Sequence, residues 1–400
     1  MSGSRLESIF SRVGLVAMAL LALFVLLLLD FALTARLSPN PSSESDDFSL
    51  HLLTRDGREI GGRAGGAAVA LAPLTVYENV PNQRGQKYRT NELGLRGSEI
   101  ALEPTRPRVI VVGGSAAFGL RVPELSTFAA RLEARLAGVE VLNAGVSGYL
   151  SAQELALVVT RLLDLGPDVL VVFDGWNDVY DPYWWSRFGD GERAHPGVNN
   201  GFRTMEDRLV RYHEIEQEPL AALFEVGRTL VRRSSVFGAL ARWLRPEPGG
   251  DSGGSLGAAQ RSAIANGYVA NLRKLRDLTA ARGIGLLVVV QPELGQHVAP
   301  EKLTQLEGRL TADFISGDAY VVNFPEIYAG FRRQVVPALR SSGVRVIDAS
   351  ARLASFPAPQ ALFVDAVHLS KKGHDQMAQI LEKPVARLLE ATGGHEVPTR

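Results

Sequence analysis

Residues 109–122 read "VIVVGGSAAFGLRV". The first four residues are β-branched, and a continuous run of this kind is typical of a strand buried on both faces of a parallel sheet. The run ends at Gly113 and Gly114, Ser115 follows, and a third glycine stands at Gly119. Glycines permit a sharp turn and a close approach of a ligand to the backbone. Because open α/β sheets bind ligands at the carboxyl ends of their strands, Ser115 is the first candidate functional residue.

Three known glycine-rich motifs do not fit this stretch. A phosphate-binding P-loop requires a lysine after its last glycine, whereas Leu120 follows Gly119. The dinucleotide fingerprint G-x-G-x-x-G does not match "GGSAAFG", and the nucleophile elbow G-x-S-x-G fails at Ala117. The stretch alone therefore leaves two interpretations of Ser115 open, a nucleophile or the N-cap of a helix on a glycine-rich turn.

Further apolar runs separated by amphipathic stretches extend the pattern along the chain. We expect strands at residues 109–113, 139–145, 168–173, 285–291 and 344–348. We expect helices at residues 126–136, 151–165 and 266–283, and a C-terminal helix with Ser370 as its N-cap. Ser151 and Glu154 form a capping box at the start of the second helix. This alternation predicts a flavodoxin-like three-layer α/β/α domain around a five-stranded parallel sheet.

The composition shifts divide the chain into five parts. They are a cytoplasmic stub and transmembrane anchor (1–36), a polar linker (37–47), an accessory segment with short β-like pieces (48–107), the α/β domain (108–392) and a tail (393–400). We expect helical insertions in the α/β domain at about 181–265 and 297–340.

The N-terminal anchor is predicted from an uncharged apolar run at residues 13–29, which together with residues 31–35 approaches the thickness of a bilayer. Arg5 and Arg12 precede this run and the acidic "SESDD" follows it, so the positive-inside rule places the N-terminus in the cytoplasm. The bulk of the chain would then be extracytoplasmic, and periplasmic in a Gram-negative cell. A cleaved signal peptide and a buried soluble helix are the alternatives, although no A-x-A cleavage site follows the run.

Composition argues against several classes of function. Lys and Arg number 43, Asp and Glu also number 43, and this balance gives no indication of a nucleic-acid partner. The chain has no cysteine, which removes disulfides, thiolate metal sites and cysteine nucleophiles. Asp174, Asp178 and Asp181 match no EF-hand spacing, and no H-E-x-x-H motif occurs. We therefore expect neither a metal ion nor a cofactor.

The loops after the other predicted strands carry the residue types that acyl transfer needs. They are "NAGVSG" (143–148), "GWND" (175–178) and "DAVHLS" (365–370). A serine becomes a nucleophile when a base such as His368 takes its proton, and Asp365 could fix the tautomer of that histidine. The N–H groups of Ser115 and Gly148 and the amide of Asn177 could stabilise a developing oxyanion.

These blocks, in this order, resemble the SGNH/GDSL hydrolase superfamily. The resemblance covers about residues 108–392, and the upstream "RTNELGLRGSEI" is similar to the lead-in of exported, membrane-anchored bacterial members. It implies that Ser115 is the nucleophile, His368 the base and Asp365 the orienting acid, with Gly148 and Asn177 as oxyanion donors. The chain departs from the family pattern at Gly114, where the family name implies Asp.

The resemblance and the predicted location together imply an extracytoplasmic serine esterase. Its expected substrates are O-acyl esters, for example acetyl esters, of an envelope saccharide or lipid, cleaved through an acyl-enzyme on Ser115. One alternative is an O-acyltransferase that passes the acyl group to a polysaccharide with the same residues. The other is a catalytically silent binding or scaffold subunit of the envelope, which the intact set of Ser115, Asp365 and His368 disfavours.

Two further features have both functional and structural interpretations. Trp176, Tyr180 and Trp184 could form an aromatic wall for the substrate, and a packed core or a membrane-interface contact are the alternatives. His374 and Asp375 form a second acid–base pair, but they fall inside the predicted C-terminal helix. We expect these two residues to lie on a solvated helix face.

Overall fold

The computed structural model describes one compact unit of the chain. The described residues are 51–53, 59–62, 68–85, 87–188, 256–298 and 319–393, and for 51–62, 184–188 and 319–323 the description is limited to the backbone. The predicted anchor (1–36), the linker (37–47) and all but the first residue of the tail (393–400) lie outside these ranges. Within the described ranges, no helix combines the length and the hydrophobicity needed to cross a bilayer.

The main sheet has five parallel strands, as predicted. They are β5 (Arg108–Gly113), β6 (Glu140–Asn143), β7 (Val169–Asp174), β8 (Gly285–Val290) and β9 (Arg345–Asp348). Their order across the sheet is β6-β5-β7-β8-β9, and every neighbouring pair is parallel. In chain order this is the 2-1-3-4-5 arrangement of flavodoxin-like folds.

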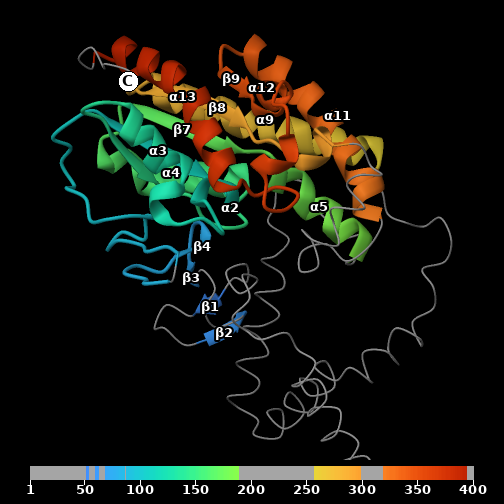
Figure 1. The fold of residues 1–400 in the computed structure, drawn as a ribbon, viewed down its shortest axis with the longest axis horizontal. Coiled ribbons are helices and arrows are strands. Elements are labelled where there is room, and N and C mark those ends of the chain that lie inside the picture. Colours follow the sequence, from blue (N-terminus) through green and yellow to red (C-terminus); the bar gives the residue numbers. More distant parts are fainter. Residues whose placement is uncertain are drawn as a thin grey trace, which may run out of the picture. The chain divides into compact units, whose positions relative to one another are not determined.

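Helices cover both faces of this sheet (Figure 1). One face carries α2 (Ser115–Phe118), α3 (Phe128–Arg135), α12 (Ala349–Leu353) and α13 (Lys371–Ala391). The other carries α4 (Ser151–Thr160), α5 (Trp176–Phe188), α9 (Ala258–Ala280) and α11 (Ala319–Ser341). Along β5, Val109 and Val111 contribute to the first core, whereas Ile110 and Val112 contribute to the second. The predicted three-layer architecture is therefore confirmed.

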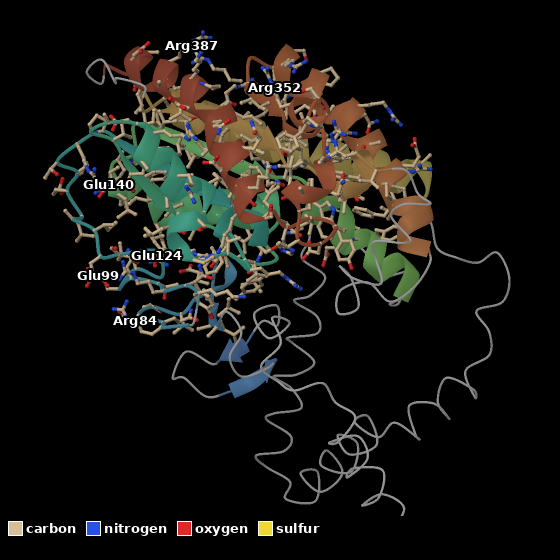
Figure 2. The ribbon with its side chains drawn as sticks, viewed as in Figure 1. Arg84, Glu99, Glu124, Glu140, Arg352 and Arg387 are labelled. Atoms are coloured by element: carbon tan, nitrogen blue, oxygen red, sulfur yellow. The ribbon has the colours of Figure 1, made fainter. Side chains whose placement is uncertain are left out.

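The helical layers are amphipathic, with polar residues turned to solvent. Met377 and Leu381 of α13 are fully buried against the sheet, whereas Arg387 of the same helix is exposed, as is Arg352 of α12 (Figure 2). Of the predicted insertions, the structure describes the end of α5, the start of α9 and α11, which is helical as expected. Residues 189–255 and 299–318 lie outside the description.

The segment before the main sheet forms a second, four-stranded sheet. It comprises β1 (His51–Leu53), β2 (Glu59–Gly62), β3 (Ala68–Ala72) and β4 (Val76–Asn79), in the order β2-β1-β3-β4. Val69 and Tyr77 are buried in the same apolar cluster as one face of the main sheet. This segment therefore shares its core with the α/β domain.

The predicted capping box of α4 is wrong. The backbone N–H of Ser151 and its hydroxyl both donate to the carboxylate of Asp178 in α5, the hydroxyl at 2.6 Å. Ser151 is the first helical residue, and the preceding Leu150 takes the cap position. Glu154 is completely buried and does not reach back to the cap. The Asp178 carboxylate takes the Ser151 N–H that the predicted box assigned to Glu154, while the Gln153 side chain accepts from the N–H of Leu150 at 3.3 Å.

The expectation of a solvated face at His374 is also wrong. The His374 ring is buried, its Nδ1 accepts a hydrogen bond from the N–H of Phe128 at 3.1 Å, and it stacks on the Phe128 ring. Burial, together with the nearby charges of Arg96, His368 and Arg131, lowers the pKa of His374 to about 3. This histidine is therefore a neutral core residue, while its neighbour Asp375 pairs with Arg135 at 3.3 Å.

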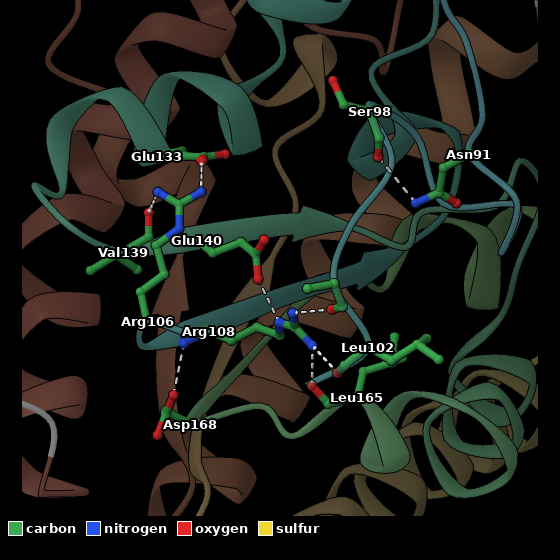
Figure 3. A network of polar contacts seen from close by, with 11 residues as sticks. Asn91, Ser98, Leu102, Arg106, Arg108, Glu133, Val139, Glu140, Leu165 and Asp168 are labelled. Atoms are coloured by element: carbon green, nitrogen blue, oxygen red, sulfur yellow. Dashed lines mark hydrogen bonds and ion pairs between the residues drawn. The ribbon is translucent and has the colours of Figure 1, made fainter. Parts of the chain in front are cut away.

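A fully buried arginine ties the sheet to the segment that precedes it (Figure 3). Arg108, the first residue of β5, forms an ion pair with Glu140 of β6 at 2.6 Å. Its guanidinium also donates to the backbone carbonyls of Ala101, Leu102 and Leu165. Each of these carbonyls would lose a partner if the guanidinium were removed.

Replacing Arg108 by Met should lower the free energy of unfolding by about 3–5 kcal/mol, because the fully buried guanidinium is lost and the half-buried Glu140 and the buried Leu165 carbonyl are left without it. Arg106→Met is the matched control, since the Arg106 side chain is 44% exposed and its ion pair with Glu133 lies at the surface. That control should cost less than about 1 kcal/mol. Urea unfolding of the two variants measures the difference, and equal losses would contradict the assigned role of Arg108.

Candidate active site

The candidate site lies at the ends of β5 and β7, the two neighbouring strands whose following connections cover opposite faces of the sheet. β5 and β7 are neighbours, with Gly113 paired opposite Phe173, and the chain leaves them toward opposite faces. Ser115 follows β5, and Asn177 follows β7. Ligands of doubly wound sheets bind at such a switch point.

Glycine at position 113 is required by the packing of these two strands. Gly113 has φ of +153°, and a Cβ there would lie 2.2 Å from the carbonyl oxygen of Phe173. A larger residue would push β5 away from β7 just before Ser115. The chain then turns directly into the short helix α2, which begins at Ser115.

Ser115, His368 and Asp365 form a continuous chain of hydrogen bonds. Nε2 of His368 lies 2.8 Å from Oγ of Ser115, and Nδ1 of His368 lies 2.8 Å from Oδ2 of Asp365. An ionised carboxylate can only accept, so Nδ1 carries the ring proton and Nε2 accepts from the serine hydroxyl. The structure thus brings together three residues that the sequence separates by as many as 253 positions.

The environment keeps Asp365 ionised. Burial alone raises the pKa of this carboxyl, but the His368 ring and the N–H groups of His368 and Val367 outweigh it, so the pKa lies below its ordinary value. The two N–H groups donate to Oδ1 at 2.7 and 2.9 Å. Arg121 adds a positive charge, with its Nε 3.5 Å from Oδ2 of Asp365. A carboxylate held in this way can orient the imidazole and stabilise its protonated form.

Two contacts hold the loop that carries Asp365 and His368, one at its end and one within it. Ser370 caps α13 by accepting from the N–H of Gly373 at 3.2 Å, as predicted. Within the loop, between Asp365 and His368, the carbonyl of Ala366 accepts from the N–H of Leu294 at 2.8 Å.

Leu294 follows Glu293, a fully buried residue that sequence reasoning missed. Burial raises the pKa of Glu293 to about 7, against the opposing effects of the Gly295 N–H, Gln296 and Arg332. Its carboxyl accepts from the Gly295 N–H at 2.9 Å and so shapes the loop after β8. The position of Glu293 just after a predicted strand was the only signal in the sequence.

Gly148 lies in a loop that β4 holds in place. It has φ of +80°, and a Cβ there would lie 2.7 Å from the Tyr77 hydroxyl. That hydroxyl donates to the carbonyl of Ser147 at 2.9 Å, and the Asn79 amide donates to the carbonyl of Gly145 at 2.9 Å. Neither Tyr77 nor Asn79 was identified from the sequence, because each acts through backbone groups about 70 positions away.

Arg96 holds the turn after Ser115. Its guanidinium donates to the carbonyls of Phe118, Gly119 and Val122 at 2.6–2.7 Å. Arg96 belongs to the stretch "RTNELGLRGSEI" that resembles the family lead-in. The sequence therefore marked this segment as part of the family pattern, but it did not indicate that Arg96 binds the turn after Ser115.

Asn177 lies against Gly114. Its Nδ2 donates to the carbonyl of Tyr149 at 2.9 Å, and a Cβ on residue 114 would approach that nitrogen to 2.5 Å. Glycine at this position, the departure from the family name, therefore makes room for the Asn177 amide. The following residue, Asp178, fixes the start of α5 to Ser151.

The predicted aromatic wall needs correction at Trp176. This ring is 2% exposed and packs on Tyr180 at 4.1 Å between ring centroids and on Phe324 at 5.3 Å. Trp176 is thus a core residue, as the packed-core alternative expected, because α5 turns it toward α11. Tyr180 is half-buried, and the side chain of Trp184 lies outside the described residues. In the part of the chain that is described, no cluster of His, Asp or Glu is arranged to hold a metal ion.

The sequence matches the GDSL-like lipase/acylhydrolase family over residues 111–376. The chain belongs to this family. The resemblance to SGNH/GDSL hydrolases is confirmed, and so is the expectation of an enzyme that acts on ester bonds. A comparison with curated proteins found no match.

Solved structures with a similar fold include three esterases or lipases. An acetyl xylan esterase, AlAXEase, has 12% sequence identity and a TM-score of 0.38, covering 70% of this chain and 99% of its own. A GDSL-like lipase from Bacteroides thetaiotaomicron has 12% identity and a TM-score of 0.38, covering 70% and 88%. An acetylxylan esterase from Geobacillus stearothermophilus has 15% identity and a TM-score of 0.36, covering 75% and 100%.

Proposed function

We propose that this GDSL-family hydrolase is a serine esterase that removes O-acyl groups, such as acetyl, from a saccharide or lipid of the cell envelope. The observation that carries the proposal is the hydrogen-bonded chain from Ser115 through His368 to Asp365. A binding or scaffold subunit has no need of a serine coupled to a histidine and a buried carboxylate. An O-acyltransferase would use the same groups and differ only in its acceptor.

The geometry supports a two-step mechanism. Oγ of Ser115 attacks the ester carbonyl while Nε2 of His368 takes its proton, and Asp365 stabilises the imidazolium that forms. His368 then gives this proton to the leaving alcohol, which leaves an acyl group on Ser115. Water, activated by the same histidine, attacks the acyl-enzyme, releases the carboxylic acid and restores the serine. These steps require no cofactor.

The proposed oxyanion site combines three donors from three loops. They are the N–H groups of Ser115 and Gly148 and the side-chain amide of Asn177. Asn177 uses one amide N–H for the carbonyl of Tyr149 and has a second for the substrate. Hydrogen bonds from Tyr77, Asn79 and Arg96 hold the loops of Gly148 and Ser115, and the Ser151–Asp178 bond holds the turn of Asn177. The donors would therefore need little rearrangement as charge develops.

We also propose that residues 13–35 anchor the protein in the membrane, with the N-terminus in the cytoplasm and the hydrolase domain outside it. The uncharged run at 13–29 and the preceding Arg5 and Arg12 support this placement. An extracytoplasmic site is the reason for naming an envelope saccharide or lipid as substrate.

The proposed nucleophile predicts that one molecule of a serine-reactive fluorophosphonate adds to the full-length protein, as measured by intact mass. Ser115→Ala should abolish the adduct, and His368→Ala should slow its formation strongly because the base is lost. Ser147→Ala is the matched control, since Ser147 is a buried serine of the neighbouring loop, and it should label normally. An adduct on the Ser115→Ala protein would exclude Ser115 as the nucleophile.

The proposed oxyanion donor predicts a loss in kcat. Asn177→Ala should lower kcat about 10²–10³-fold with little change in KM, because the amide binds charge that exists only in the transition state. Steady-state kinetics with p-nitrophenyl acetate measures both constants. A change confined to KM would show that Asn177 binds the substrate in its ground state instead.

The proposed anchor predicts that the full-length protein stays in the membrane fraction after a high-salt wash. Replacing Leu20 and Leu23 by Arg should move the protein to the soluble fraction, because each central arginine costs about 2.5–3.5 kcal/mol of insertion. Release of the unchanged protein by salt alone would refute the anchor.

A further inference from the structure

Two carboxyl groups are buried together at the start of the turn that leads to Asn177. Asp174 is the last residue of β7 and is 2% exposed, while Glu154 of α4 is 0% exposed. Their carboxyl groups lie within hydrogen-bonding reach of each other. Neither residue takes part in the proposed acyl transfer, and neither forms an ion pair with a basic residue among the described part of the chain.

The donors around this pair are too few for two ionised groups. The Tyr268 hydroxyl donates to Oδ1 of Asp174 at 2.5 Å. Oδ2 of Asp174 and both oxygens of Glu154 receive no N–H or side-chain hydroxyl from any residue that the structure describes. Two carboxylates in contact would repel each other in a buried site without hydration. A single proton between them turns one carboxyl into a donor and removes the repulsion.

The pair lies next to the turn that carries Asn177, the proposed oxyanion donor. Asp174 is followed directly by Gly175, which has φ of +102° and begins the turn. Tyr268 supports the end of β7 through its hydrogen bond to Asp174. On the other side of the turn, Asp178 binds Ser151, which lies one helical turn before Glu154 in α4. The turn with Asn177 is thus held between two carboxyl contacts to α4.

We infer that a proton shared between Glu154 and Asp174 positions the Gly175–Asn177 turn, and that loss of this proton displaces the Asn177 amide. Glu154 and Asp174 are positioning residues, since they act through the turn and do not contact the ester. This inference rests on the proposed role of Asn177 as an oxyanion donor.

The surroundings favour the protonated pair at neutral pH. Burial raises the pKa of Asp174 to about 7, and burial together with the Asp174 charge raises the pKa of Glu154 well above its ordinary value. The titratable groups that face the pair are Asp178 of α5, Tyr268 of α9 and Tyr328 of α11, with Asp181 beyond Asp178. All of these are acidic groups, so any charge on them favours retention of the proton. Rising pH removes the proton, and activity should then fall on the alkaline side.

The test compares pH profiles of kcat for p-nitrophenyl acetate hydrolysis by the full-length protein, from about pH 5 to about pH 10. Glu154→Gln supplies an amide N–H to Asp174 that does not titrate. It should keep a near-normal kcat at neutral pH and lack the alkaline fall of the wild type. Glu154→Ala should lower kcat about tenfold to a hundredfold with KM unchanged, because the turn loses its support. Glu382→Gln, a change at a buried glutamate of α13, should keep the wild-type profile.

An infrared measurement tests the proton independently of activity. Above the pKa of about 7 of Glu293, the wild type should show a protonated-carboxyl band that shifts with ¹³C-labelled glutamate and is absent from Glu154→Gln. An unchanged band in Glu154→Gln, an unchanged alkaline fall in that variant, or a normal kcat in Glu154→Ala would each overturn the inference. If the wild type neither hydrolyses the ester nor reacts with the fluorophosphonate, the proposed function fails and the positioning role fails with it. The infrared band then still shows whether the pair shares a proton.

Discussion

The parallel pairing of β5 with β7 is the constraint on which the candidate site depends. Because Gly113 lies opposite Phe173, the residues just beyond these two strands leave the sheet side by side. Ser115 and Asn177 come from segments 62 positions apart, yet no special contact is needed to bring them to the same edge. The tight approach of Gly113 to the Phe173 carbonyl shows that the spacing has no room for a side chain. A shift of this register by one residue would turn both the core valines and the site residues to the wrong face.

Much of the fold and of the candidate site could be predicted, because both follow from local sequence patterns that reflect burial and strand geometry. Continuous apolar runs marked the buried strands, and polar residues at the strand ends marked the edge where Ser115, His368 and Asp365 meet. The roles of Tyr77, Asn79 and Arg96 were not predicted, because no such pattern marks them. Each of these side chains donates to backbone carbonyls in a distant loop, and a carbonyl carries no sequence signature. The capping box at Ser151 failed for a related reason, since the carboxylate that displaced it belongs to another helix.

Buried charged groups around the sheet are stabilised in three different ways. Arg108 is satisfied by an ion pair and by carbonyl oxygens, which leaves its charge fully compensated. Asp365 keeps its charge because a histidine and two backbone N–H groups donate to it. Glu154 and Asp174 have neither kind of support beyond one tyrosine, so a proton between them is the remaining solution.

The hydrogen bonds made by the segment before the main sheet also show where the structural unit that forms the site begins. The family match starts at residue 111, and the sequence predicted a boundary at 107/108 between an accessory segment and the hydrolase domain. Hydrogen bonds from Tyr77, Asn79 and Arg96 cross that boundary and hold the loops on both sides of Ser115. The segment from about residue 68 onward is therefore part of the structural unit that forms the site.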